Sequence, residues 1–168
     1  DDITSLEARV AGLLAGSATR RAGFGLEARR AALARLAETL LAHRDEIARA
    51  VGADLGIAVV EADLVEVLPV LAEISHARRH LRSWMRPRRV WPTLMTLGTT
   101  AARHPQPKGV ALIIAPWNFP FLLALSPVVS AIAAGNAVVV KPSELTPATS
   151  ALIARLLPQA LPGLAEVF

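Results

Sequence analysis

The chain has 168 residues, of which 53% are hydrophobic and 19% charged, and this composition fits one folded domain or slightly more rather than a disordered protein. The formal net charge is only +4, and the sequence pI of about 10.9 exaggerates the basicity because no Tyr or Cys is present to titrate. The lack of cysteine excludes disulfides and thiolate chemistry within these residues. Prolines interrupt the most apolar region, so we expect no membrane span and a soluble, cytoplasmic protein.

The N-terminus shows no basic segment followed by an apolar stretch, so we expect no signal peptide in the given sequence. Because the first residue is Asp1 rather than Met, we expect that the start has been trimmed or processed.

The first part of the chain has the periodicity of helices. A first helix is predicted from Leu26, with an end at Gly52 or Gly56, because apolar residues recur along one of its sides. These residues are Leu33, Leu36, Leu40, Ile47 and Val51. A second helix is predicted from Leu64 to Trp84, with Pro69 either kinking it or lying in its first turn.

Arginines gather towards the end of this second helix. They are Arg78, Arg79, Arg82, Arg86, Arg88 and Arg89. Cations near a helix C-terminus are stabilised by the helix dipole, and we favour this interpretation. The alternative, a nucleic-acid-binding patch, is less favoured because lysines and stacking aromatic residues are nearly absent nearby, so we expect no nucleic-acid partner.

Three segments are predicted from these patterns. Residues 1–92 form an N-terminal helical segment, and residues 93–107 form an extended arm or hairpin, since prolines and threonines are frequent from Trp91 to Gln106. Residues 108–168 form the beginning of an α/β domain.

The α/β segment alternates strand and helix. Val110–Ala115 and Ala137–Val140 are apolar at every position, as parallel strands covered on both faces require. Between them lies a helix over Phe121–Ala134, either continuous or split at Pro127, and a Gly-Asn turn follows. Another helix is predicted to start at Pro147 with Thr146 as its N-cap. This alternation of strands and helices predicts a right-handed βαβ unit of a parallel sheet.

Two polar residues follow the ends of these strands. Asn118 comes just after the first strand and Lys141 immediately after the second, and ligands of such sheets bind at the carboxyl ends of strands. The second strand needs neighbours on both edges, but only Leu164–Phe168 remains to supply one. We therefore expect a ligand site at this edge and an incomplete domain.

Residues 109–147, GVALIIAPWNFPFLLALSPVVSAIAAGNAVVVKPSELTP, strongly resemble the aldehyde dehydrogenase superfamily. The resemblance extends upstream through residues 66–90, which look most like the branch acting on fatty, aromatic and coniferyl-type aldehydes. The blocks PWNFP and KPSE together carry it. It implies an N-terminal segment of such an enzyme, with the first half of a Rossmann-like NAD(P)-binding domain. It also implies an oligomerisation arm within residues 93–103 and a homodimeric complete protein.

In this family a cysteine thiolate attacks the aldehyde, a hydride passes to NAD or NADP, and water releases the acid with help from a glutamate. The resemblance implies that Asn118 donates its side-chain amide to the oxyanion of the thiohemiacetal. An Asp would repel that charge and a Leu could not donate, whereas Asn offers two N–H donors without net charge. The alternative reading of Asn118 is a simple turn residue.

The resemblance also implies a set of cofactor-binding residues, namely Ile114, Ala115, Pro116, Trp117, Lys141, Ser143 and Glu144. Pro116 and Trp117 would line the nicotinamide side, and Lys141 would bind the adenosine ribose hydroxyls. Glu144 would favour NAD over NADP, because a carboxylate accepts hydrogen bonds from hydroxyls and repels a phosphate. The alternatives are that Lys141 is an ordinary surface lysine, that Glu144 is a charge in the turn, and that Ser143 only shapes that turn.

Residues that the chemistry of this family requires are missing from these 168 residues. The nucleophilic cysteine is absent and the glutamate base lies outside this chain, so the 168 residues alone are expected to be inactive. His76 and His80 share a helix face, but Arg78 and Arg79 would repel a metal ion, and we expect no metal site. No carboxylate pair is proposed. The alternative function is a non-catalytic, truncated relative that binds a nucleotide or pairs with a full-length partner.

Overall fold

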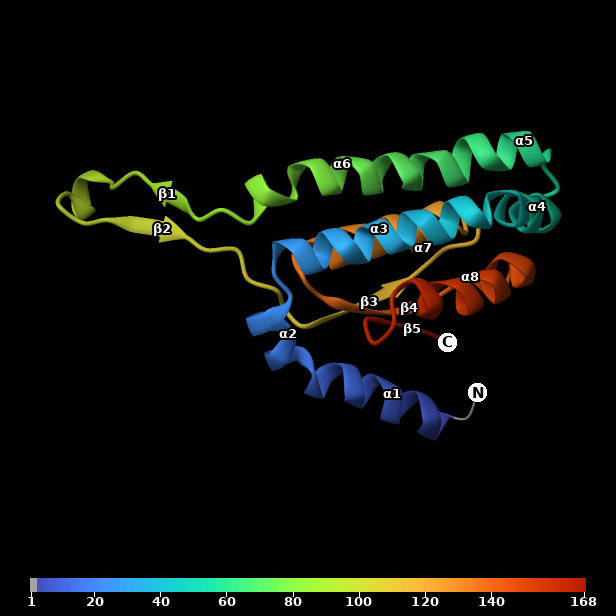
Figure 1. Ribbon diagram of the computed structural model, residues 1–168, viewed down its shortest axis with the longest axis horizontal. Coiled ribbons are helices and arrows are strands. Elements are labelled where there is room, and N and C mark those ends of the chain that lie inside the picture. Colours follow the sequence, from blue (N-terminus) through green and yellow to red (C-terminus); the bar gives the residue numbers. More distant parts are fainter. Residues whose placement is uncertain (1–2) are drawn as a thin grey trace.

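The computed structural model describes residues 3–168, so Asp1 and the processing that it suggests lie outside the described residues. The first half of the chain is helical (Figure 1). Its elements are α1 (Ile3–Ala15), α2 (Ser17–Gly23), α3 (Leu26–Ala42), α4 (Arg44–Leu55), α5 (Val59–Ala62), the π-helical turn η1 (Asp63–Val67) and α6 (Leu68–Trp84).

The first predicted helix is in fact two helices. The chain leaves helical geometry at His43, where φ is −112° and ψ is 15°, and α4 begins at the next residue. Gly56 ends α4 in the left-handed conformation, with φ of 69°, which glycine adopts without steric cost. The apolar stripe crosses the break unchanged because α3 and α4 bury their apolar sides in the same core.

The second predicted helix starts earlier than its apolar pattern suggested, at α5, and passes through η1 before α6. Pro69 lies in the first turn of α6. The dipole interpretation of the arginines is wrong for several of them, because α6 ends at Trp84. Arg82 lies in its last turn, whereas Arg86 follows the helix and Arg88 begins a strand.

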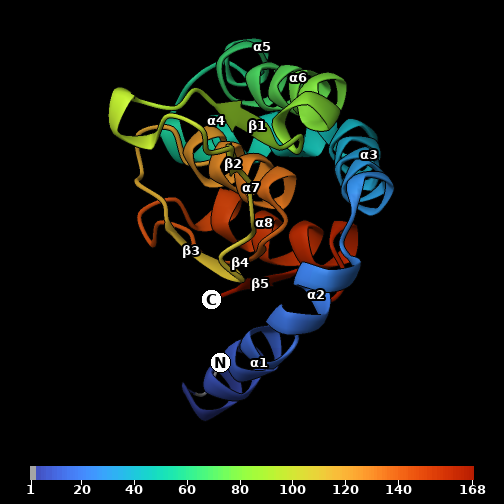
Figure 2. The same cartoon turned by 90° about the vertical axis from the view of Figure 1, so that its left-hand side faces the viewer.

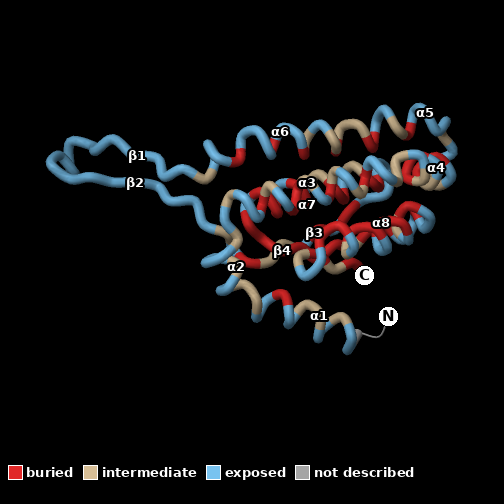
Figure 3. The backbone as a smooth tube through the Cα atoms, viewed as in Figure 1, coloured by how far each residue is buried: buried red, intermediate tan, exposed pale blue. Residues whose placement is uncertain are grey.

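An antiparallel hairpin follows α6 and projects away from the body of the molecule (Figure 1). It consists of β1 (Arg88–Val90), the 3-10 turn η2 (Leu94–Thr96) and β2 (Ala101–Arg103). The hairpin starts before residue 93, where the arm was expected to begin. Figure 3 shows it exposed along its length, and Trp91, Leu94 and Met95 are 92%, 88% and 95% exposed.

A parallel sheet fills the second half of the chain and has the order β3 (Val110–Ile114), β4 (Ala137–Lys141), β5 (Ala165–Val167). The helix α7 (Leu122–Ala134) connects β3 to β4, and α8 (Pro147–Ala160) connects β4 to β5. This βαβ arrangement confirms the α/β prediction, and Pro127 lies inside α7 without splitting it. The central strand β4 is paired on both edges, since β5 pairs with residues 138–140.

The main core lies between the sheet and the helices. Val138 and Val140 face α7 and α8, and α3, α4 and α6 pack outside these two helices (Figures 1 and 2). The other face of β4 meets Leu13 of α1. On β3, however, Leu112 and Ile114 remain 61% and 69% exposed. One face of the sheet is therefore only partly covered in this chain.

In the described part of the chain, no helix combines the length and the apolar character needed to cross a bilayer.

Candidate functional site

The candidate site is built from two turns at the carboxyl edge of the sheet. The β3–α7 turn comprises residues 115–121, and the β4–α8 turn comprises residues 142–146. Because Ile114 pairs in register with Lys141, the two strands end side by side. The structure thus brings both turns to one edge, as the strand pattern predicted.

The β3–α7 turn has buried ends and an exposed middle. The Ala115 N–H donates to the Lys141 carbonyl oxygen over 2.9 Å, and Ala115, Pro120 and Phe121 are buried. Between them Pro116, Trp117, Asn118 and Phe119 are exposed. Within residues 3–168, nothing forms a hydrogen bond with the Asn118 side chain. Its amide N–H groups are therefore free to donate to a ligand.

The far end of this turn is held by a residue that the sequence interpretation missed. Glu66 of η1 is completely buried, and its Oε2 accepts the backbone N–H groups of Phe121 at 3.0 Å and Leu122 at 2.7 Å. Burial raises the pKa of the Glu66 carboxyl, and the two hydrogen bonds oppose this rise. The sequence does contain a signal for the burial of Glu66, because Glu66 lies four residues before Val70 and eight before Ile74, on the apolar side of the helix.

The β4–α8 turn carries the other predicted residues. The Lys141 ammonium donates to Glu144 Oε2 at 2.6 Å and to the Pro142 carbonyl at 3.1 Å. The Glu144 side chain is 78% exposed and that of Lys141 36%, so solvent reaches this ion pair. The hydrogen bond from Lys141 holds the pKa of Glu144 below its usual range.

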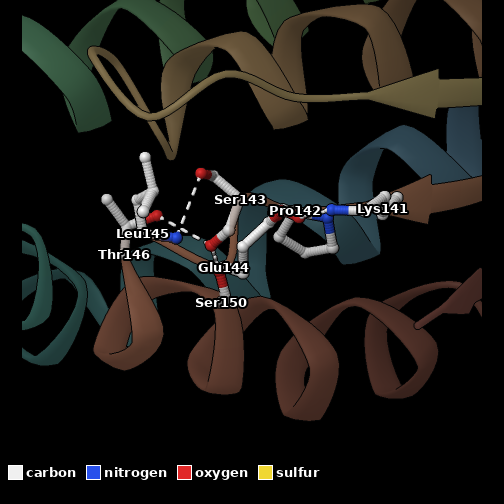
Figure 4. Close-up of polar contacts among 7 residues, drawn as sticks. All are labelled: Lys141, Pro142, Ser143, Glu144, Leu145, Thr146 and Ser150. Atoms are coloured by element: carbon white, nitrogen blue, oxygen red, sulfur yellow. Dashed lines mark hydrogen bonds and ion pairs between the residues drawn. The ribbon is translucent and has the colours of Figure 1, made fainter.

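Ser143 is buried at the centre of the β4–α8 turn (Figure 4). Its Oγ accepts the Leu145 N–H at 3.3 Å, and its carbonyl accepts the hydroxyls of Thr146 at 3.2 Å and Ser150 at 2.7 Å. These contacts favour the alternative in which Ser143 shapes the turn.

The prediction that Thr146 is the N-cap residue of α8 and that Pro147 opens the helix is confirmed, but the Thr146 side chain does not cap the helix. Its hydroxyl donates back to the Ser143 carbonyl and makes no hydrogen bond with the helix N–H groups. Asp54 of α4 caps the helix instead, since its carboxylate accepts the N–H groups of Ala148 at 3.1 Å and Thr149 at 2.7 Å. The cap comes from a different part of the chain.

A shallow groove of about 490 Å³ runs along this second turn, between the end of β4, the first turns of α8 and the C-terminal end of β5. Lys141, Ser143 and Glu144 line one side, and Ser150 and Phe168 contribute to the other. Most of the exposed lining of the groove is apolar, and the Lys141–Glu144 pair supplies charged groups to it, so the groove suits a ligand that has both an apolar surface and hydrogen-bonding groups.

The two histidine rings of α6 stack on one another. The rings of His76 and His80 stack with centroids 4.1 Å apart, and Trp84 continues the stack at 6.0 Å from His80. Among the described residues, no three His, Cys, Asp or Glu side chains are grouped so that they could hold a metal ion.

Comparison with known proteins relates this geometry to a family. Residues 15–166 match the aldehyde dehydrogenase family. The chain is 43% identical over 125 residues to a protein of Caulobacter vibrioides named "Probable coniferyl aldehyde dehydrogenase", covering 72% of this chain and 26% of that protein. This similarity fits the branch that residues 66–90 indicated.

Two solved structures share the fold. The substrate-bound AldH of Staphylococcus aureus superposes with a TM-score of 0.90 and 33% identity, covering 97% of this chain and 36% of that one. The succinic semialdehyde dehydrogenase of Streptococcus pyogenes, in complex with NADP+, gives a TM-score of 0.88 at 21% identity, covering 99% and 36%.

The chain spans about a quarter of the length of the curated relatives that it matches. The match nevertheless covers most of its own residues, from the last residue of α1 into β5, and includes both turns of the candidate site. This chain therefore belongs to the aldehyde dehydrogenase family.

Proposed function

We propose that this chain is the N-terminal part of an NAD(P)-dependent aldehyde dehydrogenase that oxidises an aldehyde to a carboxylic acid. The observation that supports this most strongly is the exposed, unengaged amide of Asn118, which lies at the same edge of the parallel sheet as the Lys141–Glu144 pair. The cysteine nucleophile and the glutamate base belong to parts of the enzyme outside these 168 residues.

In this proposal Asn118 is the oxyanion donor. When a thiolate attacks the aldehyde carbonyl, negative charge develops on the carbonyl oxygen, and a fixed N–H donor stabilises it without reorganisation. The turn suits this task, since its ends are buried and hydrogen-bonded while the Asn118 amide has no hydrogen-bond partner among residues 3–168.

The cofactor would lie along both turns. Pro116 and Trp117 would line the nicotinamide side, with Ile114 and Ala115 also binding the cofactor. Lys141 and Glu144 would bind the adenosine ribose, with Ser143 supporting their turn. The bound nicotinamide supplies the hydride acceptor. Glu144 favours NAD, because an exposed carboxylate beside the ribose accepts hydroxyl hydrogen bonds and repels a 2′-phosphate.

The hairpin would serve the assembly of the enzyme. Its exposed apolar residues Trp91, Leu94, Met95 and Leu97 favour burial against a second copy, which supports a homodimer of the complete protein. The substrate is a small-molecule aldehyde.

The test is the aldehyde-dependent reduction of NAD and NADP by the intact protein as its host produces it. We expect turnover in the wild type, and in Asn118→Ala a kcat lower by roughly 10²- to 10³-fold with unchanged cofactor affinity. Asn118→Asp, which keeps the size but places a negative charge at the oxyanion, should be at least as damaged.

A second candidate is a non-catalytic relative that binds a nucleotide or a full-length partner, and the exposed Leu112 and Ile114 of the edge strand β3 favour a partner there. The same assay separates the two functions. Cofactor binding without any aldehyde-dependent turnover by the intact protein would contradict the dehydrogenase proposal and support the relative. A kcat in Asn118→Ala equal to that of the wild type would remove the oxyanion role.

A further inference from the structure

The far end of the Asn118 turn is anchored to a part of the chain that contributes no group to the proposed chemistry. Its near end is fixed by the sheet, through the 2.9 Å hydrogen bond from Ala115 N–H to the Lys141 carbonyl. Its far end is fixed by Glu66, which reaches from η1 to the N–H groups of Phe121 and Leu122. The exposed residues between these anchors include Asn118.

We propose that Glu66 is a positioning residue for Asn118, acting through the hydrogen bonds that tie the start of α7 to η1. This inference rests on the proposed role of Asn118. Glu66 itself is completely buried on the inner side of the turn, whereas Asn118 is exposed, so Glu66 does not touch the reacting atoms. It defines where the turn ends.

A local cap would be the ordinary solution for the start of a helix, and α7 lacks one. The N-cap position holds Phe121, which has no side-chain acceptor, so two of the first N–H groups of α7 would be unsatisfied without Glu66. A Ser or Asp within the turn could have met this need at lower cost. A carboxylate from η1 additionally couples the position of the turn to the helical layer.

Glu66 also occupies a costly position. It has no exposed surface, and its Oε1 lacks a hydrogen-bond partner among the described residues. Burying a carboxylate is unfavourable unless its interactions compensate, and here the compensation comes from two N–H donors at a helix N-terminus. The wide turn of η1 directs residues 66 and 67 into the core.

The experiment compares Glu66→Leu, which removes the acceptor, with Glu66→Gln, which keeps one acceptor oxygen, in the intact protein. Glu73→Leu is the matched control, because Glu73 also reaches from α6 to α7 but accepts a hydrogen bond from the exposed Ser130 hydroxyl at 3.2 Å. Hydrogen exchange is measured on peptides covering Phe121 and Leu122. Steady-state kinetics give kcat per folded active site and KM for the cofactor.

We expect Glu66→Leu to lose exchange protection at these two amides and to lower kcat by roughly 10- to 100-fold, with KM for the cofactor changed by less than about twofold. Glu66→Gln should retain most of kcat, and the Glu73 control should match the wild type. In an Asn118→Ala background, Glu66→Leu should lower kcat by less than about twofold, because the group that it positions is already absent.

Additive losses in the double variant, or an unchanged kcat in Glu66→Leu, would overturn the proposal. If Glu66→Leu does not fold, Glu66→Asp replaces it, since the shorter side chain withdraws the carboxylate from both N–H groups; an unchanged kcat there would also overturn it. If the proposed function itself is wrong, the wild-type protein shows no aldehyde-dependent turnover, so the two failures can be told apart. In that case amide protection that persists in the Glu66 variants would remove the anchoring claim on its own.

Discussion

Both turns of the candidate site are held by a carboxylate that caps the following helix, but the two carboxylates differ in burial. Each follows a parallel strand, and each precedes a helix that is capped by a carboxylate from the N-terminal helices, Glu66 for α7 and Asp54 for α8. Glu66 is completely buried, whereas Asp54 is partly exposed. The N-terminal helices are thus part of the construction of the site.

This difference matches what the two turns are proposed to do. An oxyanion donor is effective when it is positioned in advance, and the β3–α7 turn has buried anchors at both ends. The β4–α8 turn presents an exposed Lys141–Glu144 pair, which a ribose can enter by replacing one weak surface contact. The comparison predicts unequal responses to substitution.

The largest effect is expected at the buried cap. Glu66→Leu should lower the free energy of unfolding by about 2 to 4 kcal/mol: two backbone N–H groups lose their acceptor at about 1 to 3 kcal/mol each, and removal of a buried carboxyl group with an unpaired oxygen offsets part of this loss. Chemical denaturation of the wild type and the variant measures it. A loss no larger than that of an exposed substitution would contradict the assignment of Glu66 as the tighter anchor.

The exposed cap should matter less. Asp54→Ala removes the acceptor for Ala148 and Thr149, and the loss of an N-cap typically costs about 1 kcal/mol. The same denaturation experiment should therefore rank Asp54→Ala below Glu66→Leu. The reverse order would break the comparison between the two turns.

The contribution of Glu66 to stability should also depend on pH. Since burial raises the native pKa of Glu66, the folded state binds more protons than the unfolded state between the unfolded value, about 4.3, and the higher native one. The contribution of Glu66 to stability is complete below the unfolded value and declines as pH rises through the native pKa. As pH rises over that range, the wild type should therefore lose stability relative to Glu66→Gln. Chemical denaturation of both proteins at several pH values measures this change. A stability difference that does not depend on pH would refute the prediction.

The smallest effect on stability is expected at the surface pair. Glu144→Gln should leave the thermal unfolding midpoint nearly unchanged, because the carboxylate is exposed to water. Its effect should appear in ligand binding. The affinity for NADP relative to that for NAD should rise by roughly tenfold, which is the size of effect expected from one modest interaction. Calorimetric titration of the intact protein with both dinucleotides provides the measurement, and an unchanged ratio would remove Glu144 from cofactor selection.

Much of the fold was predictable from local patterns. The strands and α7 follow from continuous apolar runs and from Gly135, and the common edge of Asn118 and Lys141 follows from the parallel topology. The break at His43 and the π-helical turn η1 were not visible, because the apolar spacing continues through both.

The caps could not be read from local sequence for a different reason. Glu66 lies 55 residues from Phe121, and Asp54 lies 95 residues from Thr149. Such contacts arise only when the helical layer packs on the sheet, and the local rule for helix starts assigned the role to Thr146 instead. An acid on the buried side of a helix was the one signal available for Glu66.

The most direct test of the central claim, that the two turns form one cofactor and oxyanion site, is a crystal structure of the intact protein with NAD bound. We predict the adenosine ribose hydroxyls within hydrogen-bonding distance of Lys141 and Glu144, the Lys141–Glu144 contact opened, and the nicotinamide beside Pro116 and Trp117 with the Glu66 anchors unchanged. A dinucleotide bound elsewhere, with the Lys141–Glu144 pair intact, would contradict the account.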